Sequence, residues 1–463
     1  MVTALRRLFG GRRHDVDMTE GSIIKNLVLF ALPLLVGNLF QQLYNMVDTW
    51  VIGQTGENGA FAAVGSVGPI INIMIGIFSG LASGAGVVIS RHFGAHDEEG
   101  VRRAVHTSIA ATAVLSVVFT VLGLTLSPTA VSLMLRGEGG EVYPYAVTYL
   151  TIYFAGISAL LIYNMGAGIL RAVGDSRHPL YFLIVSAVTN IALDLLFVFA
   201  LGMGVTGVAL ATVISEVLSA ILTVLTLLRT PSCVRLVPRA IRIDPGTLGS
   251  IVLIGIPAAI QLALTAFSNV FVQSYIANVN GDQTATLAGW TTYSKIDMFL
   301  FLPSQSLAIA TTTFVGQNLG AGNIPRARRG IRTAFLLAAA VTAPTIGLVM
   351  LVAPHLAGIF NPDPAVVAVA SLLLRYITPF YIFTCVNQVF AAGLRGAGNS
   401  TAPMLIMLLS FVGFRQLYLL VMSSYISNDL IPVAMGYPAG WAICCLVMTV
   451  YYLTYKFKEP KKK

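Results

Sequence analysis

Long apolar stretches separated by short polar segments dominate this chain. Twelve stretches are apolar enough to form membrane helices, at residues 23–50, 60–90, 105–126, 142–168, 179–201, 204–228, 248–279, 285–314, 331–352, 367–393, 403–424 and 430–454. A helix needs about 20 apolar residues to cross a bilayer. We therefore predict an all-α integral membrane protein with twelve transmembrane helices.

The chain also repeats itself, half against half. Residues 170–179 read LRAVGDSRHP and residues 394–403 read LRGAGNSTAP, and an offset of 224 residues also maps Pro33 onto Pro257. Six helices per half is an even number, so both halves enter the membrane from the same side and form a parallel repeat. Many carriers are built in this way around a central site, which makes transport the leading hypothesis.

The repeat and the polar segments predict the domain organisation. We expect a cytoplasmic N-terminal segment 1–22, a six-helix lobe 23–228, a polar, Pro-bearing linker 229–247, a second six-helix lobe 248–454 and a basic tail 455–463. Residues 1–20 are charged throughout, so we expect no cleavable signal peptide.

Composition supports a membrane protein. The chain is 56% hydrophobic and 10% charged, with a mean hydropathy of +0.82, whereas soluble proteins carry roughly 25% charged residues. The net charge of +9 does not indicate nucleic acid, because of where the basic residues lie. If the N-terminus is in the cytoplasm, Arg136 is the only basic residue in the outside loops. Acidic residues such as Glu57 and Glu138, in contrast, fall in these loops. This distribution follows the positive-inside rule and predicts that both termini are cytoplasmic.

Several functions are disfavoured. The four cysteines show no pairing pattern, and no Cys/His metal site or metal cofactor is expected. The chain has no GxxxxGK[ST] motif and no loop that could hold a nucleotide domain. We therefore expect a transporter rather than an enzyme, driven by an ion gradient or by the gradient of its substrate.

Polar residues inside the spans are candidates for function, because a charge at the centre of a membrane helix costs about 2.5–3.5 kcal/mol. Gln41, Asn45 and Asp48 are spaced i, i+4, i+7 and form one polar stripe on a helix that Pro33 interrupts. The alternative to a functional role is that Asp48 lies at the level of the outer lipid headgroups, near the end of this helix.

Two further pairs in the first half share a face. Asn190 and Asp194 are spaced i, i+4, and so are Thr212 and Glu216. Carboxylate, amide and hydroxyl oxygens suit a hard cation, and a buried carboxylate beside another is equally suited to carry a proton. The alternative for Asn190 and Asp194 is a structural clamp between helices. Glu216 is a third coupling carboxylate, a drug-binding carboxylate or the partner of a buried cation.

The second half carries a different set, Lys295, Asp297 and Arg415. Residues i and i+2 do not share a helix face, so Lys295 and Asp297 are not expected to pair. Two explanations fit these residues equally: they form ion pairs between helices, or they have a role in transport.

The chain resembles the multidrug and toxic compound extrusion (MATE) transporters. The resemblance rests on ALPLLVGNLFQQLYNMVDTWVIG near the start, VGQNLGAGN at 315–323 and the repeated LRAxGD/LRGAGN pair, and it covers about residues 20–455. Within the family, the first and fifth helices look like the DinF/MepA-like bacterial branch. The resemblance implies two six-helix lobes in a V shape in the bacterial plasma membrane, and export of cationic or amphipathic drugs in exchange for Na⁺ or H⁺ by alternating access.

The resemblance also implies a coupling site. In the DinF-like branch this site is a helix 1 Asp, a helix 5 Asn-x-x-x-Asp and a helix 6 Thr, which Asp48, Asn190, Asp194 and Thr212 match. The NorM branch relies on acidic residues in helices 7 and 10. Ala266 and Thr384 occupy those places here, so that site looks absent.

Two other functions remain open. A flippase for lipid-linked precursors shares a related fold and favours cationic residues that hold a pyrophosphate. The acidic first lobe disfavours it, whereas Lys295 and Arg415 favour it. A passive channel or receptor fits the even repeat and paired polar faces less well. The expected partners are small-molecule drugs or organic cations and the bilayer, with the protein as a monomer.

Overall fold

The computed structural model describes residues 16–54, 58–135 and 140–457. Most of the predicted N-terminal segment, Glu57, Arg136, Glu138 and the end of the basic tail lie outside the described residues.

All regular elements in the described part of the chain are helical, as predicted. The first half contains α2 (Ile23–Gly53), α3 (Asn58–Gly94), α4 (Glu98–Met134), α5 (Val142–Ala172), α6 (Arg177–Asp194) and α7 (Gly204–Arg229). The second half contains α8 (Pro245–Ile276), α9 (Gln283–Gly320), α10 (Ile324–Phe360), α11 (Pro364–Ile377), α12 (Tyr381–Gly396), α13 (Thr401–Leu408), α14 (Arg415–Val421), α15 (Leu430–Ala434) and α16 (Gly436–Thr454). Among the described residues, 12 spans are long and apolar enough to cross a membrane. This confirms the predicted fold class.

Three spans contain irregular helix that the apolar pattern did not predict. The tenth span changes from α11 to α12 through the 3₁₀ turn Thr378–Phe380, where a proline lacks the amide donor of a regular helix. The fifth and eleventh spans contain π-helical segments, η1 (Leu195–Ala200) and then η4 (Leu409–Phe414) and η5 (Met422–Ile426). Such segments occur frequently at functional sites.

The chain forms two compact units. The first contains Leu32–Ile256, and the second contains Met18–Ala31 and the residues from Pro257 onward. Two helices are therefore divided between the units, α2 just before its internal Pro33 and α8 at its internal Pro257. Because proline removes an intrahelical hydrogen bond, each division lies beside a point where the helix lacks one.

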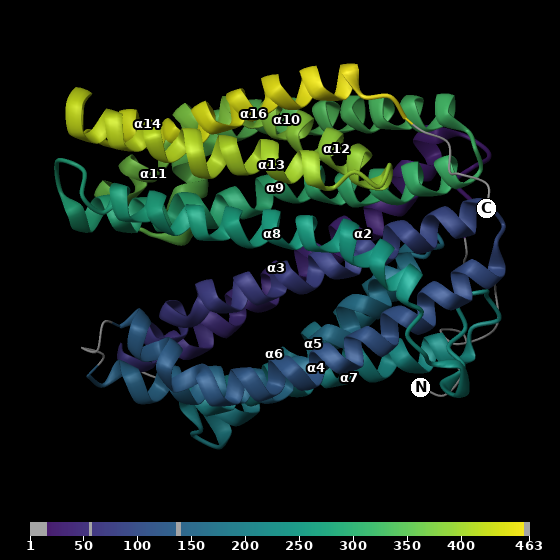
Figure 1. Cartoon of the computed structure of the whole chain (residues 1–463). Coiled ribbons are helices and arrows are strands. Elements are labelled where there is room, and N and C mark those ends of the chain that lie inside the picture. Colours follow the sequence, from purple (N-terminus) through teal and green to yellow (C-terminus); the bar gives the residue numbers. More distant parts are fainter. Residues whose placement is uncertain (1–15, 55–57, 136–139, 458–463) are drawn as a thin grey trace. The chain divides into compact units, whose positions relative to one another are not determined.

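Each unit packs around one central span (Figure 1). In the first unit α5 contacts α3, α4 and α7, and in the second the tenth span, α11 with α12, contacts α9, α10 and α16. Fully buried aliphatic side chains line these contacts, among them Leu150 and Ile157 in α5 and Leu373 and Leu374 in α11. The fourth and tenth spans correspond in the repeat, so the packing is repeated as well.

The duplicated sequence forms the same turn in both units. Gly174 and Gly398 have φ of 89° and 76°, a conformation that glycine adopts most readily. The next amide closes each helix on a carbonyl five residues earlier, Asp175 N on Leu170 O at 3.0 Å and Asn399 N on Leu394 O at 2.9 Å. These turns explain why the LRxxG pattern occurs twice.

The linker between the halves is bound to the start of α4. Val237 N donates to His106 Nε2 at 3.1 Å, and Asp244 N donates to Thr107 Oγ1 at 3.1 Å. His106 Nδ1 lies 2.6 Å from Arg102 O, so both nitrogens of the ring contact backbone groups. The linker is thereby ordered although it is polar and contains proline.

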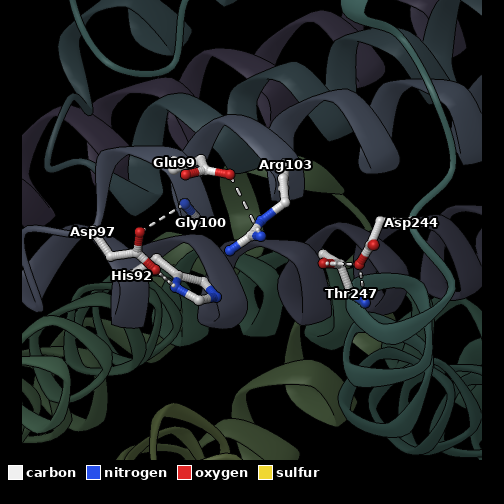
Figure 2. Close-up of polar contacts among 7 residues, drawn as sticks. All are labelled: His92, Asp97, Glu99, Gly100, Arg103, Asp244 and Thr247. Carbon is white, nitrogen blue, oxygen red and sulfur yellow. Dashed lines mark hydrogen bonds and ion pairs between the residues drawn. The ribbon is translucent and has the colours of Figure 1, made fainter. Parts of the chain in front are cut away.

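Carboxylates cap the helices on either side of this contact (Figure 2). Asp97 accepts from Gly100 N at 2.9 Å and Asp244 accepts from Thr247 N at 2.8 Å. The Gly100 hydrogen bond lowers the pKa of Asp97, and the Thr247 hydroxyl and amide lower the pKa of Asp244. Both carboxylates are therefore held in the ionised form that caps a helix N-terminus best.

Candidate functional site

A pair of carboxylates from α2 and α6 forms the centre of the first unit's polar site. Asp48 interacts with the side chains of Asp194 and Asn190, and Asp194 is 0% and Asn190 1% exposed. Within the described residues, Asp48 Oδ1, both Asp194 oxygens and both Asn190 amide atoms are buried without a partner in hydrogen-bonding geometry. Buried polar groups are normally paired, so this cluster has unused capacity for a ligand.

Glu216 of α7 approaches the same region of the first unit, and Thr212 lies one turn before it on that helix. Thr212 is 7% exposed and donates its hydroxyl proton to Val208 O at 3.0 Å, which leaves the lone pairs of its oxygen available. Glu216 Oε2 is buried without a partner among the described residues. Tyr149 interacts electrostatically with Asp48, Asp194 and Glu216, so three helices contribute acidic groups around one tyrosine.

Tyr149 and its neighbour Tyr153 are not among the site residues predicted from the sequence. Both lie in α5 and are 7% and 4% exposed, and Glu216 interacts with both. The signal was present, because Tyr145, Tyr149 and Tyr153 are spaced i, i+4, i+8 and share one face of the helix. Tyr44 of α2 adds a third ring that interacts with Glu216.

The remaining members of the helix 1 stripe lie differently. Gln41 is half-buried and interacts with Tyr44, which connects it to the site. Asn45 is exposed, and its carbonyl accepts from Thr49 Oγ1 at 2.9 Å. The polar stripe therefore does not enter the acidic cluster as a whole.

The cluster can bind a cation or hold protons. Two carboxylates that face each other in a low dielectric cannot both remain charged without a cation or a shared proton. Asp48, Asp194, Asn190 and Thr212 provide oxygen atoms of the kind that hard cations prefer. The described residues contain no group of three or more His, Cys, Asp or Glu arranged to hold a metal ion.

The second unit holds its charged residues in another way. Asp297 accepts from Tyr293 Oη at 3.1 Å, and Lys295 is half-buried. These two form no ion pair with each other among the described residues, as their spacing predicts. Arg415 is 2% exposed and donates to Ser268 Oγ at 2.6 Å and Asn269 Oδ1 at 3.0 Å.

Comparison with known proteins agrees with the repeat and the fold. The MatE family model matches residues 33–196 and again residues 257–418. The chain is 28% identical over 443 residues to the probable multidrug resistance protein YoeA of Bacillus subtilis, with 94% of each chain covered. It is 27% identical over 445 residues to the probable multidrug resistance protein NorM of Thermotoga maritima, again with 94% of each covered.

A solved structure has the same fold. It is described as the outward-facing conformation of a multidrug resistance MATE family transporter of the MOP superfamily, and it matches with a TM-score of 0.89 and 24% identity over 95% of this chain and 97% of that chain. The double match of one family model confirms that the two halves of this chain are repeats.

Proposed function

Because this chain belongs to the MatE family of multidrug efflux transporters, we propose that it exports cationic or amphipathic small molecules in antiport with H⁺ or Na⁺ by alternating access. We place it as a monomer in the bacterial plasma membrane, with both termini cytoplasmic. One observation carries the proposal. Asp48 of α2 lies beside Asp194 and Asn190 of α6, and these side chains have buried polar atoms without hydrogen-bond partners among the described residues.

Coupling follows from the electrostatics of this pair. Binding of a cation or proton neutralises the polar face of α2, and Pro33 allows this helix to bend there. A gradient drives export only when the ion and the drug favour different conformations of the protein. We assign ion coupling to Asp48, Asn190, Asp194 and Thr212.

The drug contacts are assigned to Glu216 and its tyrosines. A carboxylate beside the aromatic rings of Tyr44, Tyr149 and Tyr153 suits a lipophilic cation, which gains from charge attraction and from cation–π contact. The flippase alternative is weaker, because Arg415, one of the two cations that favoured it, has its guanidinium bonded to neutral groups and is 2% exposed.

The decisive experiment measures dye export in proteoliposomes with Na⁺ and pH gradients imposed separately. We expect Asp48→Asn and Asp194→Asn to abolish gradient-driven export while the proteins still insert and fold, since a neutral isostere is cheaper to bury. Asp297→Asn is the matched control and is expected to retain most of the export. Full uphill export by both first-unit variants, together with its loss in the control, would place coupling in the second unit and refute the proposal.

A further inference from the structure

The two units place opposite charges at corresponding helix contacts. In each unit the first and fifth spans of the half meet through polar side chains, Asp48 with Asp194 in the first unit and Ser268 with Arg415 in the second. The contact between the first and fifth spans therefore contains a guanidinium in the second unit and carboxylates in the first.

The repeat makes this comparison residue by residue. At the offset of 224, Asn45 corresponds to Asn269, which binds Arg415, whereas Asp48 corresponds to Val272 and Asp194 to Tyr418. The acids are thus absent from the second unit. Arg415 itself corresponds to Ile191, one position after Asn190.

The surroundings of the guanidinium have the composition of a cation site. Arg415 donates from Nη2 to Ser268 Oγ at 2.6 Å and Asn269 Oδ1 at 3.0 Å, and from Nε to Phe411 O at 3.1 Å. The ring of Tyr437 lies 4.7 Å from the guanidinium carbon. Neutral oxygens and an aromatic face are ligands that bind a small cation.

A carboxylate does not pair with this cation. Arg415 forms no ion pair with Asp or Glu in the part of the chain that the structure describes. Asp297 reaches it only indirectly, because both residues interact with Tyr437. The buried charge is therefore stabilised by neutral ligands from α8, η4 and α16.

Both charged groups border a π-helical segment of their own span. In the fifth span η1 begins directly after Asp194, and in the eleventh span η4 ends directly before Arg415. Each charged group thus borders a segment where its helix departs from regular geometry, as is frequent at functional sites.

We propose that Arg415 is a tethered cation: its guanidinium permanently occupies the contact between α8 and α14 that corresponds to the ion-coupling contact between α2 and α6. The inference rests on the proposed function, because it assigns the coupling ion to the first unit. It explains how a duplicated transporter responds to an ion in one unit only, since the second contact already contains its own cation. Arg415 is then a positioning residue.

The test replaces the tethered cation with a free one. In Arg415→Ala we expect coupled export to fall by about tenfold or more, since Ser268 Oγ and Asn269 Oδ1 are left buried without their hydrogen-bond donor. Millimolar guanidinium chloride should restore the rate to within about threefold of the parent and leave the parent unaffected, because Ser268 and Asn269 would again have a cation. Arg415→Lys keeps the charge and should retain export. Arg375→Ala, at an exposed arginine of α11, is the matched control and should show neither effect.

Thermal melting of the purified variants gives a readout that does not depend on transport. Guanidinium should raise the melting temperature of Arg415→Ala and leave that of Arg375→Ala unchanged. Absence of this rise overturns the inference, whereas failure of the Asp48 and Asp194 experiment with a preserved rise overturns only the proposed function. If Arg415→Ala does not fold, a folded and active Arg415→Lys supports a required cation. Loss of folding in both variants contradicts it, because the shape of the side chain would then be what is needed.

Discussion

The ionisable side chains inside the spans differ in what surrounds them. Arg415 and Asp297 have neutral hydrogen-bond partners, whereas Asp48, Asp194 and Glu216 keep buried oxygens without one among the described residues. An unpaired buried polar atom costs roughly 1–3 kcal/mol. Groups that remain unpaired at that cost are the ones expected to meet a ligand, and this separates the acidic residues of the first unit from Arg415 and Asp297.

Glu216 provides a prediction at this scale. In Glu216→Gln we expect KM for a lipophilic monocation to rise about tenfold, equivalent to about 1.4 kcal/mol, because the attraction between unit charges is lost. KM for an uncharged substrate should not change. Export kinetics with a pair of dyes that differ in charge would measure this.

Glu141→Gln is the control, since this carboxylate is exposed and makes no capping hydrogen bond at the start of α5. An equal rise for charged and uncharged dyes would show that Glu216 has a structural role and does not bind the cation.

Individual helices and turns repeat with greater fidelity than side chains do. The turn after α5 and the turn after α12 have the same hydrogen bonds and the same positive φ. The fifth and eleventh spans both contain π-helical segments, at different positions. Backbone geometry has thus been retained in both halves while the polar side chains on it diverged.

Substitution of Gly174 and of Gly322, which has a φ of 73° just after α9, tests this backbone requirement. Gly322→Ala should lower the free energy of unfolding by about 1 kcal/mol, the cost of the left-handed conformation alone, because open space surrounds that position. Gly174→Ala should lower it by about 2–3 kcal/mol, since an added Cβ would also overlap the Val16 carbonyl. Thermal unfolding in detergent would compare the two, and equal losses would show that the contact with Val16 is unimportant.

The whole molecule combines a symmetric fold with asymmetric chemistry. One family model matches both halves, and the helix packing around the fourth and tenth spans is alike. The buried, unpartnered carboxylates described here nevertheless belong to the first unit. We attribute ion coupling to one unit for this reason.

Membrane orientation is the prediction at this scale. In a background without the four cysteines, Gln283→Cys at the exposed start of α9 should react with an impermeant thiol reagent added to intact cells. Arg239→Cys in the exposed linker should react only after permeabilisation. The reason is the positive-inside distribution of Arg and Lys, and the reverse labelling pattern would invert the topology.

Local pattern alone determined the number of spans, the duplication and the polar helix faces of Asp48, Asn190 and Asp194. Hydrophobicity and i, i+4 spacing are properties of single segments, and an apolar segment of about 20 residues can satisfy all its backbone hydrogen bonds within a bilayer by forming a helix. The repeated glycine turns could be predicted as well, because the LRxxG pattern is also a property of a single segment.

The tertiary structure decided which of these faces meet. Ser268 and Arg415 are separated by 147 residues, and Tyr149 joins the acidic groups from a third helix. Such contacts depend on how apolar helix surfaces pack, which no single segment encodes. The π-helical segments and the neutral ligands of Arg415 could be recognised only once the helices were in place, because both arise from contacts between spans.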